Sequence, residues 1–135
     1  MHIKGRFVMN GTNIVFDTCA IIKLLDRQYD LLALGIDLDE SRFLTSVMVR
    51  MELMAKRDLS ASEELGIREF LKDLSVVPLD YAVEQKAVEI RRITSVKLPD
   101  CIIVATTIVL DAILLTDDDR LLNLSWPGFR AQNIL

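Results

Sequence analysis

The chain has 135 residues, of which 51% are hydrophobic and 27% charged, with only 5 Gly and 3 Pro. This composition fits one globular domain and excludes a disordered, collagen-like or low-complexity chain. The 20 acidic residues outnumber the 16 Lys and Arg, for a formal net charge of -4. One His and two Cys are too few for a structural zinc site, and a Ser-His-Asp triad would have to recruit His2 from the chain end. Any catalysis is therefore expected to depend on carboxylates.

Short apolar runs alternate along the chain with segments of helical periodicity. Strands are predicted at residues 13–17, 42–46, 75–79 and 112–116, with a final edge strand at 130–135. Helices are predicted at residues 18–25, 29–34, 47–56, 60–74, 80–93 and 98–111, with a turn and a short helix at 117–122. This alternation predicts an α/β domain with a mainly parallel sheet.

Several residues punctuate these elements. Thr18 is expected to cap the first helix, and Gly35 suits the position just after a helix end. Ser60 and Glu63 match the capping-box pattern. The apolar sides of the helices are expected to include Ile22, Leu25, Leu65, Ala82 and Val88.

Residues 1–12 are interpreted as an N-terminal extension and residues 13–135 as the domain. Cys19 and Cys101 are interpreted as reduced and buried, which favours a cytoplasmic protein. The longest apolar stretch, residues 101–110, is too short to span a bilayer, so no membrane association is expected.

Acidic residues stand at unusual places in this pattern. Asp17 ends the first strand, and residues 117–119 are three aspartates that follow the fourth strand. In open α/β sheets, ligands bind at the carboxyl ends of the strands. Asp100 begins the most apolar helix, where the helix dipole favours an ionised carboxylate and where it can face the same edge.

Glu52 is the fourth candidate, because it lies on a mostly apolar helix where burying a carboxylate is costly. Bringing four such acids together would cost several kcal/mol per ion unless a cation compensated them. Ligation by oxygen alone favours Mg²⁺ or Mn²⁺ over zinc. A carboxylate-bound ion of this kind suits the hydrolysis of phosphodiesters.

Each acid also has an ordinary explanation. Asp17 could only cap a helix, and Asp100 could only interact with a helix dipole. Glu52 could face solvent or pair with Lys56, and residues 117–119 could form a solvated turn. The four positions together favour the functional interpretation.

At these positions the chain resembles PIN-domain ribonucleases, particularly the VapC-type toxins of toxin–antitoxin pairs. The resemblance covers residues 13–135 and depends on four motifs in the family's order. These are Val15-Phe-Asp17-Thr18, Ser46 with Glu52, Leu98-Pro99-Asp100 followed by Ile102-Ile103-Val104-Ala105, and Leu115-Thr116-x-Asp118.

The resemblance implies a three-layer α/β/α fold with a sheet of four or five strands and an Mg²⁺- or Mn²⁺-dependent endoribonuclease, the toxin of a type II pair. It implies metal ligation or water activation by Asp17, Glu52, Asp100 and Asp118, with Asp119 as a possible substitute for Asp118. Thr116, Ser46 and Thr18 would support the site. It also implies an RNA substrate, a homodimer, and a cognate antitoxin whose C-terminal segment covers the site.

Arg91, Arg92 and Lys97 form a basic stretch that could contact RNA phosphates or be a solvated helix face. Cys19 stands where many members of the family have Asn or Ser. It is interpreted either as a packing residue or as a redox-sensing thiol. Two other functions stay open: a catalytically inactive PIN-like interaction module, and a phosphatase of the haloacid-dehalogenase type. The phosphatase would need a second acid where Cys19 stands.

Overall fold

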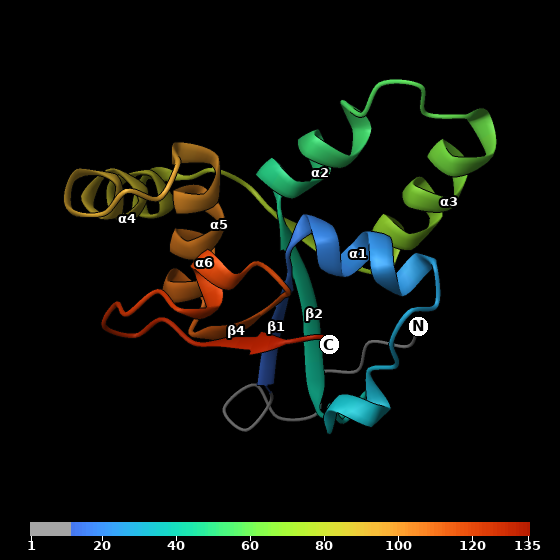
Figure 1. Cartoon of the computed structure of the whole chain (residues 1–135), viewed down its shortest axis with the longest axis horizontal. Coiled ribbons are helices and arrows are strands. Elements are labelled where there is room, and N and C mark those ends of the chain that lie inside the picture. The colour runs from blue at the N-terminus through green and yellow to red at the C-terminus, as the bar shows by residue number, and fades with distance from the viewer. Residues whose placement is uncertain (1–11) are drawn as a thin grey trace.

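A computed structural model describes residues 12–135, so the predicted extension lies outside the described residues except for Thr12. The strands are β1 Thr12–Phe16, β2 Ser41–Ser46, β3 Ser75–Val77, β4 Ala112–Thr116 and β5 Ala131–Asn133. The helices are α1 Thr18–Leu25, α2 Val47–Met54, α3 Ala61–Lys72, α4 Tyr81–Ile93, α5 Leu98–Val109 and α6 Asp119–Leu122, with a 3₁₀ turn at Leu32–Leu34 (Figure 1).

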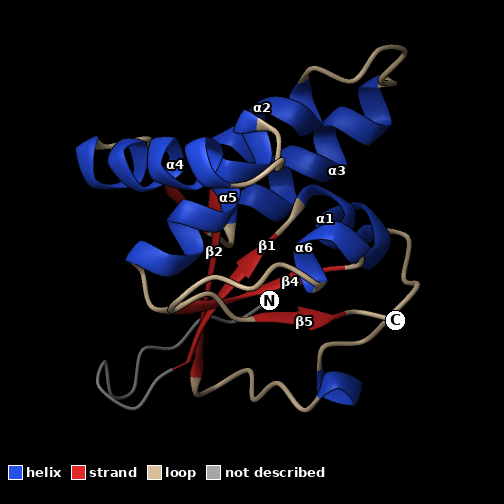
Figure 2. Cartoon of the chain, turned by 60° about the vertical axis from the view of Figure 1, so that its left-hand side comes forward, coloured by secondary structure: helices blue, strands red, loops and turns tan. Residues whose placement is uncertain are grey.

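The five described strands form one sheet in the order β3-β2-β1-β4-β5, and every neighbouring pair is parallel. The predicted parallel α/β sheet is therefore confirmed. Figure 1 shows α4 and α5 on one side of the strands and α1 and α3 on the other, which is the expected three-layer arrangement. The final strand, β5, lies at the sheet edge next to the C-terminus (Figure 2).

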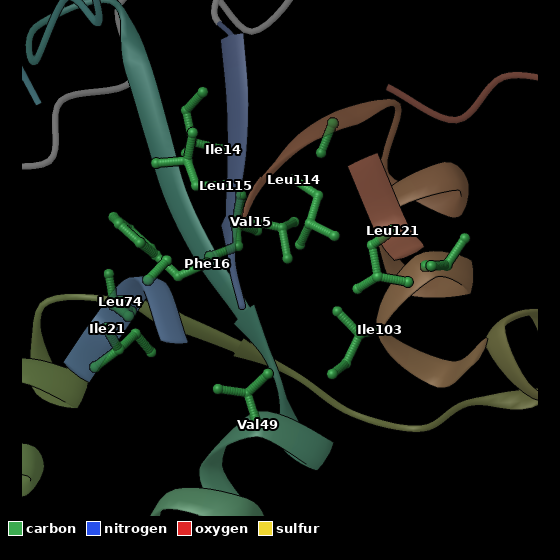
Figure 3. Packing of buried hydrophobic residues seen from close by; sticks show 14 of the residues in the cluster. Ile14, Val15, Phe16, Ile21, Val49, Leu74, Ile103, Leu114, Leu115 and Leu121 are labelled. Carbon is green, nitrogen blue, oxygen red and sulfur yellow. The ribbon is translucent and has the colours of Figure 1, made fainter. Parts of the chain in front are cut away.

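Side chains of β1 alternate between the two faces of the sheet, as the pleat requires. Val15 lies opposite Leu114 and on the side of Ile103 and Leu121, whereas Phe16 lies on the side of Ile21 (Figure 3). On that second face the Phe16 ring stacks on Phe43 and meets Phe70 of α3 edge-on, each with centroids 5.9 Å apart. Both faces of β1 are thus covered by packed side chains over residues 14–16, immediately before Asp17.

Local capping follows the sequence with one correction. The prediction that Thr18 caps α1 is wrong, because Asp17 is the N-cap and Thr18 is the first helical residue. Gly35 adopts the left-handed conformation (φ 80°) after the 3₁₀ turn, and the Ser60–Glu63 capping box is present. The helix predicted at residues 29–34 is wrong, because only the 3₁₀ turn at Leu32–Leu34 forms there.

The predicted inward positions are partly wrong. Leu65 is 59% exposed, and Ile22, Leu25, Ala82 and Val88 are also exposed. α3 and α4 each bury only a narrow stripe of residues, so apolar positions one step from the stripe reach solvent. Between residues 12 and 135, no helix is long and apolar enough to cross a membrane.

Candidate active site

A pocket of about 510 Å³ opens at the carboxyl ends of β1 and β4. Asp17, Glu52, Asp100 and Asp118 all line it, although they come from four separate parts of the chain. The other lining residues are Thr18, Cys19, Ile22, Asp117 and Arg120. The structure therefore brings together the four acids singled out in the sequence.

Asp17 is the most buried of these acids, with 7% of its surface exposed. Its Oδ1 accepts a hydrogen bond from the Thr18 backbone N–H at 2.8 Å, and its Oδ2 accepts one from the Thr116 hydroxyl at 2.7 Å. Burial nevertheless raises the pKa of Asp17, because the loss of water outweighs these bonds. The carboxylate is fixed in place, and a nearby positive charge would stabilise its ionised form.

Glu52 reaches the pocket from α2, whose N-cap is the buried Ser46 hydroxyl, 3.0 Å from the Met48 backbone nitrogen. The Thr18 hydroxyl donates to Glu52 Oε1 at 3.2 Å. Ser46 thus positions the helix and Thr18 positions the carboxylate. The alternative pairing with Lys56 is absent among residues 12–135, since Lys56 lies 3.7 Å from Glu63 instead.

Glu52 is exposed at the pocket rim, so the expectation of a carboxylate buried on an apolar helix face is wrong. The turn of α2 that carries Glu52 packs its core side through Val49 and Leu53 and leaves Glu52 facing the pocket. Desolvation nevertheless raises the pKa of Glu52, and the negative charges of Asp17 and Asp100 add to the effect.

Asp118 and Asp100 complete the acidic lining. The Asp118 backbone N–H donates to the Thr116 hydroxyl at 3.1 Å, and its side chain caps α6 through the Arg120 N–H at 2.9 Å. Asp100 lies in the first turn of α5, and desolvation, with Asp17 and Asp118 nearby, raises its pKa. Asp119 is exposed and does not line the pocket, so the geometry favours Asp118 as the fourth acid.

Two cations moderate this negative charge. Lys23 forms an ion pair with Asp117, which lowers the pKa of the Asp117 carboxyl. Arg120 Nη2 lies 3.4 Å from Asp118 Oδ2 and 3.9 Å from Asp100 Oδ2, and its side chain is 67% exposed. Sequence reasoning missed Arg120; its place two residues after Asp118, at the start of a helix, was the available clue.

The predicted basic stretch is not part of this pocket. Arg91, Arg92 and Lys97 are exposed and do not line it. Arg91 donates to the Thr94 carbonyl at 3.4 Å. The positive charge of Lys97, which is outside the pocket lining, offsets a small part of the rise in the pKa of Asp100. Phosphate contacts by these residues stay a prediction, restricted to the approach to the site.

Cys19 and Cys101 are free thiols, and Cys101 is fully buried as expected. Cys19 is only half-buried, so the prediction of a buried thiol is not met there; its Sγ lies 3.7 Å from Asp17 Oδ2 and 3.6 Å from the Thr116 hydroxyl. Burial raises the pKa of Cys19 to about 12, so the thiol stays protonated at neutral pH. A protonated thiol is a poor nucleophile, which favours the packing interpretation over redox sensing.

No three Cys, His, Asp or Glu side chains between residues 12 and 135 are already close enough together to hold a metal ion. The pocket does supply the donor set that Mg²⁺ prefers, carboxylate oxygens around open space. Mg²⁺ is commonly bound by one or two carboxylates and keeps several of its waters, so a tight cage of protein ligands is not required.

Comparisons with known proteins agree with this architecture. The sequence matches the PIN domain family over residues 14–127. The chain belongs to the PIN domain family. No curated protein sequence is significantly similar to this PIN domain.

Several solved structures share the PIN fold of this chain. DNA-bound VapBC from Salmonella typhimurium matches at 20% identity and a TM-score of 0.75, over 92% of this chain and 99% of that one. VapBC2 from Rickettsia felis, bound to a promoter DNA fragment, matches at 17% identity and a TM-score of 0.74, over 90% of this chain and 98% of that one. VapBC-5 from Mycobacterium tuberculosis, described as a member of a family of toxin–antitoxin systems, matches at 18% identity and a TM-score of 0.70. The match covers 91% of this chain and 99% of that one.

A second, mainly apolar groove of about 500 Å³ adjoins the acidic pocket of this PIN domain. It lies between α1, α2 and α3 and is lined by Leu25, Leu53, Leu59 and Ile67 among others. The two cavities share Thr18, Ile22 and Glu52. A chain lying in the groove would therefore reach the acids at its end.

Proposed function

We propose that this PIN domain is a metal-dependent endoribonuclease that hydrolyses phosphodiester bonds, and that it is the toxin of a type II toxin–antitoxin pair. The observation that carries the proposal is the convergence of Asp17, Glu52, Asp100 and Asp118 on one pocket. Three of these carboxyls have a raised pKa, chiefly through desolvation, so the pocket holds negative charge that it does not fully compensate. The family match gives no support to the phosphatase alternative.

The donor set fits Mg²⁺ or Mn²⁺ as the cofactor. Asp17, Asp100 and Asp118 would hold the ion, directly or through water. Such an ion lowers the pKa of water and stabilises the charge that develops on a phosphodiester during cleavage. Arg120 is the one basic residue among the described residues that line the pocket, and Lys23, which is outside that lining, is paired with Asp117.

The protein's own groups would then orient the reaction. The two hydrogen bonds to Asp17 fix its carboxylate, so little reorganisation is needed when substrate binds. Glu52, held by the Thr18 hydroxyl, would orient the attacking water and accept its proton. The raised pKa of Glu52 brings its proton affinity closer to what a general base needs near neutral pH.

The apolar groove supports the partner assignment. VapBC-5, which shares this fold, is described as a member of a family of toxin–antitoxin systems, and another structure with this fold, from Klebsiella pneumoniae, is described as a toxin–antitoxin complex. We propose that a C-terminal segment of a cognate antitoxin lies along the groove, reaches the acids and blocks RNA. The homodimer belongs to the same proposal. So does a cytoplasmic location, because cellular RNA and reduced thiols such as Cys19 are expected in that compartment.

The direct test is cleavage of single-stranded RNA by the purified chain with Mg²⁺ or Mn²⁺ and with a chelator. Asp17→Asn and Asp100→Asn are expected to lower kcat by about 10²-fold or more. Asp111→Asn is the matched control, because Asp111 is exposed and pairs with Arg130 away from the pocket. Cleavage by both pocket variants at the wild-type rate would contradict the proposal.

Metal-dependent thermal stabilisation separates the enzyme from an inactive interaction module. An ion that binds the folded protein raises Tm with its concentration, and the gain should be absent in Asp17→Asn. A module without a working acidic site would show no such gain in the wild-type chain. Activity and metal binding are thereby tested independently.

A further inference from the structure

A third cavity, of about 300 Å³, is lined in part by Asp100 and Arg120 and shares no lining residue with the apolar groove. It is formed by the segment 94–96 between α4 and α5, by Leu121 of α6 and by residues 123–125, which follow α6. Asp100 and Arg120 line both this cavity and the acidic pocket, so the two spaces meet at these side chains. We call this third cavity the flanking pocket.

The chemistry of the flanking pocket suits one nucleoside. Val96 and Leu124, both partly exposed, supply apolar surface against which a base can lie. Ser95, Asn123 and Ser125 supply polar side chains that have no hydrogen-bond partner among residues 12–135. The volume is at the small end of the range for ligand sites, which excludes a folded partner but admits a single splayed-out nucleotide.

Parts of the flanking pocket are already fixed by the fold. The Thr94 hydroxyl donates to the Ile90 carbonyl at 2.9 Å and accepts from the Val96 backbone N–H at 3.2 Å, which holds the α4–α5 segment. Leu121 is 1% exposed and anchors the opposite wall in the core. A preformed pocket loses little conformational entropy when it binds.

Arg120 provides the link between this pocket and the reacting phosphate. Its Nη2 faces Asp118 and Asp100, whereas its Nε and Nη1 donors have no side-chain partner in the described chain. A guanidinium has five N–H donors in a rigid fork, so these free donors can bind phosphate oxygens.

We propose that the flanking pocket binds the nucleoside next to the scissile phosphodiester, that Arg120 binds the adjoining phosphate, and that this enzyme thereby selects the base at that position. The inference rests on the proposed nuclease function and extends it to a specificity site. Single-stranded RNA is the substrate class it fits, because only an unstacked base presents its edges to such a pocket.

The first test is a cleavage profile on a library of single-stranded RNA oligonucleotides with Mg²⁺ or Mn²⁺. The double variant Asn123→Ala, Ser125→Ala is expected to lose about three- to tenfold discrimination between bases at one position beside the cut. Arg120→Gln is expected to raise KM about tenfold, with partial rescue by Arg120→Lys, because the charge contact is restored without the fork. Arg130→Gln, which removes an exposed arginine paired with Asp111, is the control.

A second test needs no catalysis. The four ribonucleoside 5′-monophosphates are titrated into ¹⁵N-labelled protein, and the backbone amides of Ser95 and Asn123 are followed by NMR. If RNA is cut but the variants leave the base profile unchanged, the flanking-pocket proposal is wrong and the nuclease proposal stands. If the wild-type chain cuts no RNA, the nuclease proposal fails, and the NMR shifts decide: perturbed amides support the pocket, and unperturbed amides overturn it.

Discussion

The Thr116 hydroxyl donates to Asp17 Oδ2 at 2.7 Å, although the two residues lie at the ends of different strands. The same hydroxyl accepts the Asp118 backbone N–H at 3.1 Å. One buried oxygen thus links the ends of β1 and β4 and sets the relative position of two pocket acids. Sheet register supplies this closeness, since Phe16 pairs with Leu115 in the parallel ladder.

Thr116→Val should therefore damage both stability and activity. Loss of the hydroxyl leaves the buried Asp17 Oδ2 without its strongest donor, which costs about 1–3 kcal/mol of the free energy of unfolding. Urea unfolding and RNA cleavage measure the two effects. Thr107→Val is the matched control, because Thr107 is equally buried but its hydroxyl donates only to the Ile103 carbonyl of its own helix. Equal losses in both variants would show that Thr116 has no special role.

Asp100 gives a prediction on pH. Desolvation, then Asp17 and Asp118, raises the pKa of Asp100 above its ordinary value of 3.8. Above pH 3.8 the folded protein then binds more protons than the unfolded chain at this site, so its free energy of unfolding falls as pH rises towards the raised pKa. Without metal, Asp100→Asn is expected to be more stable than the wild-type chain at pH 7, and this advantage should vanish below about pH 3.

Urea unfolding with chelator across this pH range checks the sign. Added Mg²⁺ should stabilise the wild-type chain and should stabilise Asp100→Asn less, because the variant has one carboxylate fewer for the ion. An Asp100→Asn protein less stable than the wild type at pH 7 without metal would contradict the argument. The control Asp111→Asn changes an exposed acid and is expected to shift stability little.

Cys19 should be slow to react with thiol reagents in the native state. Burial raises its pKa to about 12, so the thiolate that attacks disulfide reagents is scarce at pH 7.5. Labelling in native buffer is expected to be far slower than in denaturant, and to accelerate as pH rises. Rapid native labelling at pH 7.5 would restore the redox-sensing alternative, and Cys19→Ala would identify the reacting thiol, since Cys101 is fully buried.

The acids could be predicted from sequence because the chemistry and the topology of the fold restrict where they stand. Asp17 and Asp118 follow strands, and parallel strands place their carboxyl ends at one edge. The ordinary explanation is confirmed for Asp17, which caps α1, and the same residue also lines the pocket, as the functional hypothesis requires. A single carboxylate with two oxygens can do both.

Other features depend on tertiary packing that periodicity does not contain. Arg120 lines both the acidic pocket and the flanking pocket only because α6 starts beside the first turn of α5. Leu25 and Leu65 follow the apolar pattern of their helices, yet they are exposed, because the neighbouring helices leave a groove or solvent there. Such exposed apolar positions can be found only once the helices are placed in space.

Gly66 gives the last prediction, because it lies within α3 and lines the apolar groove. A Cβ at this position would meet no heavy atom within 4 Å, and Gly costs a helix interior about 0.5–1 kcal/mol relative to Ala. Gly66→Ala should therefore raise the free energy of unfolding by that amount.

Gly35→Ala should lower the free energy of unfolding by about 1–2 kcal/mol, because Gly35 has φ +80° and L residues are strained there. Urea unfolding of both variants checks the opposite signs, and a destabilised Gly66→Ala would mean that the groove floor tolerates no methyl group.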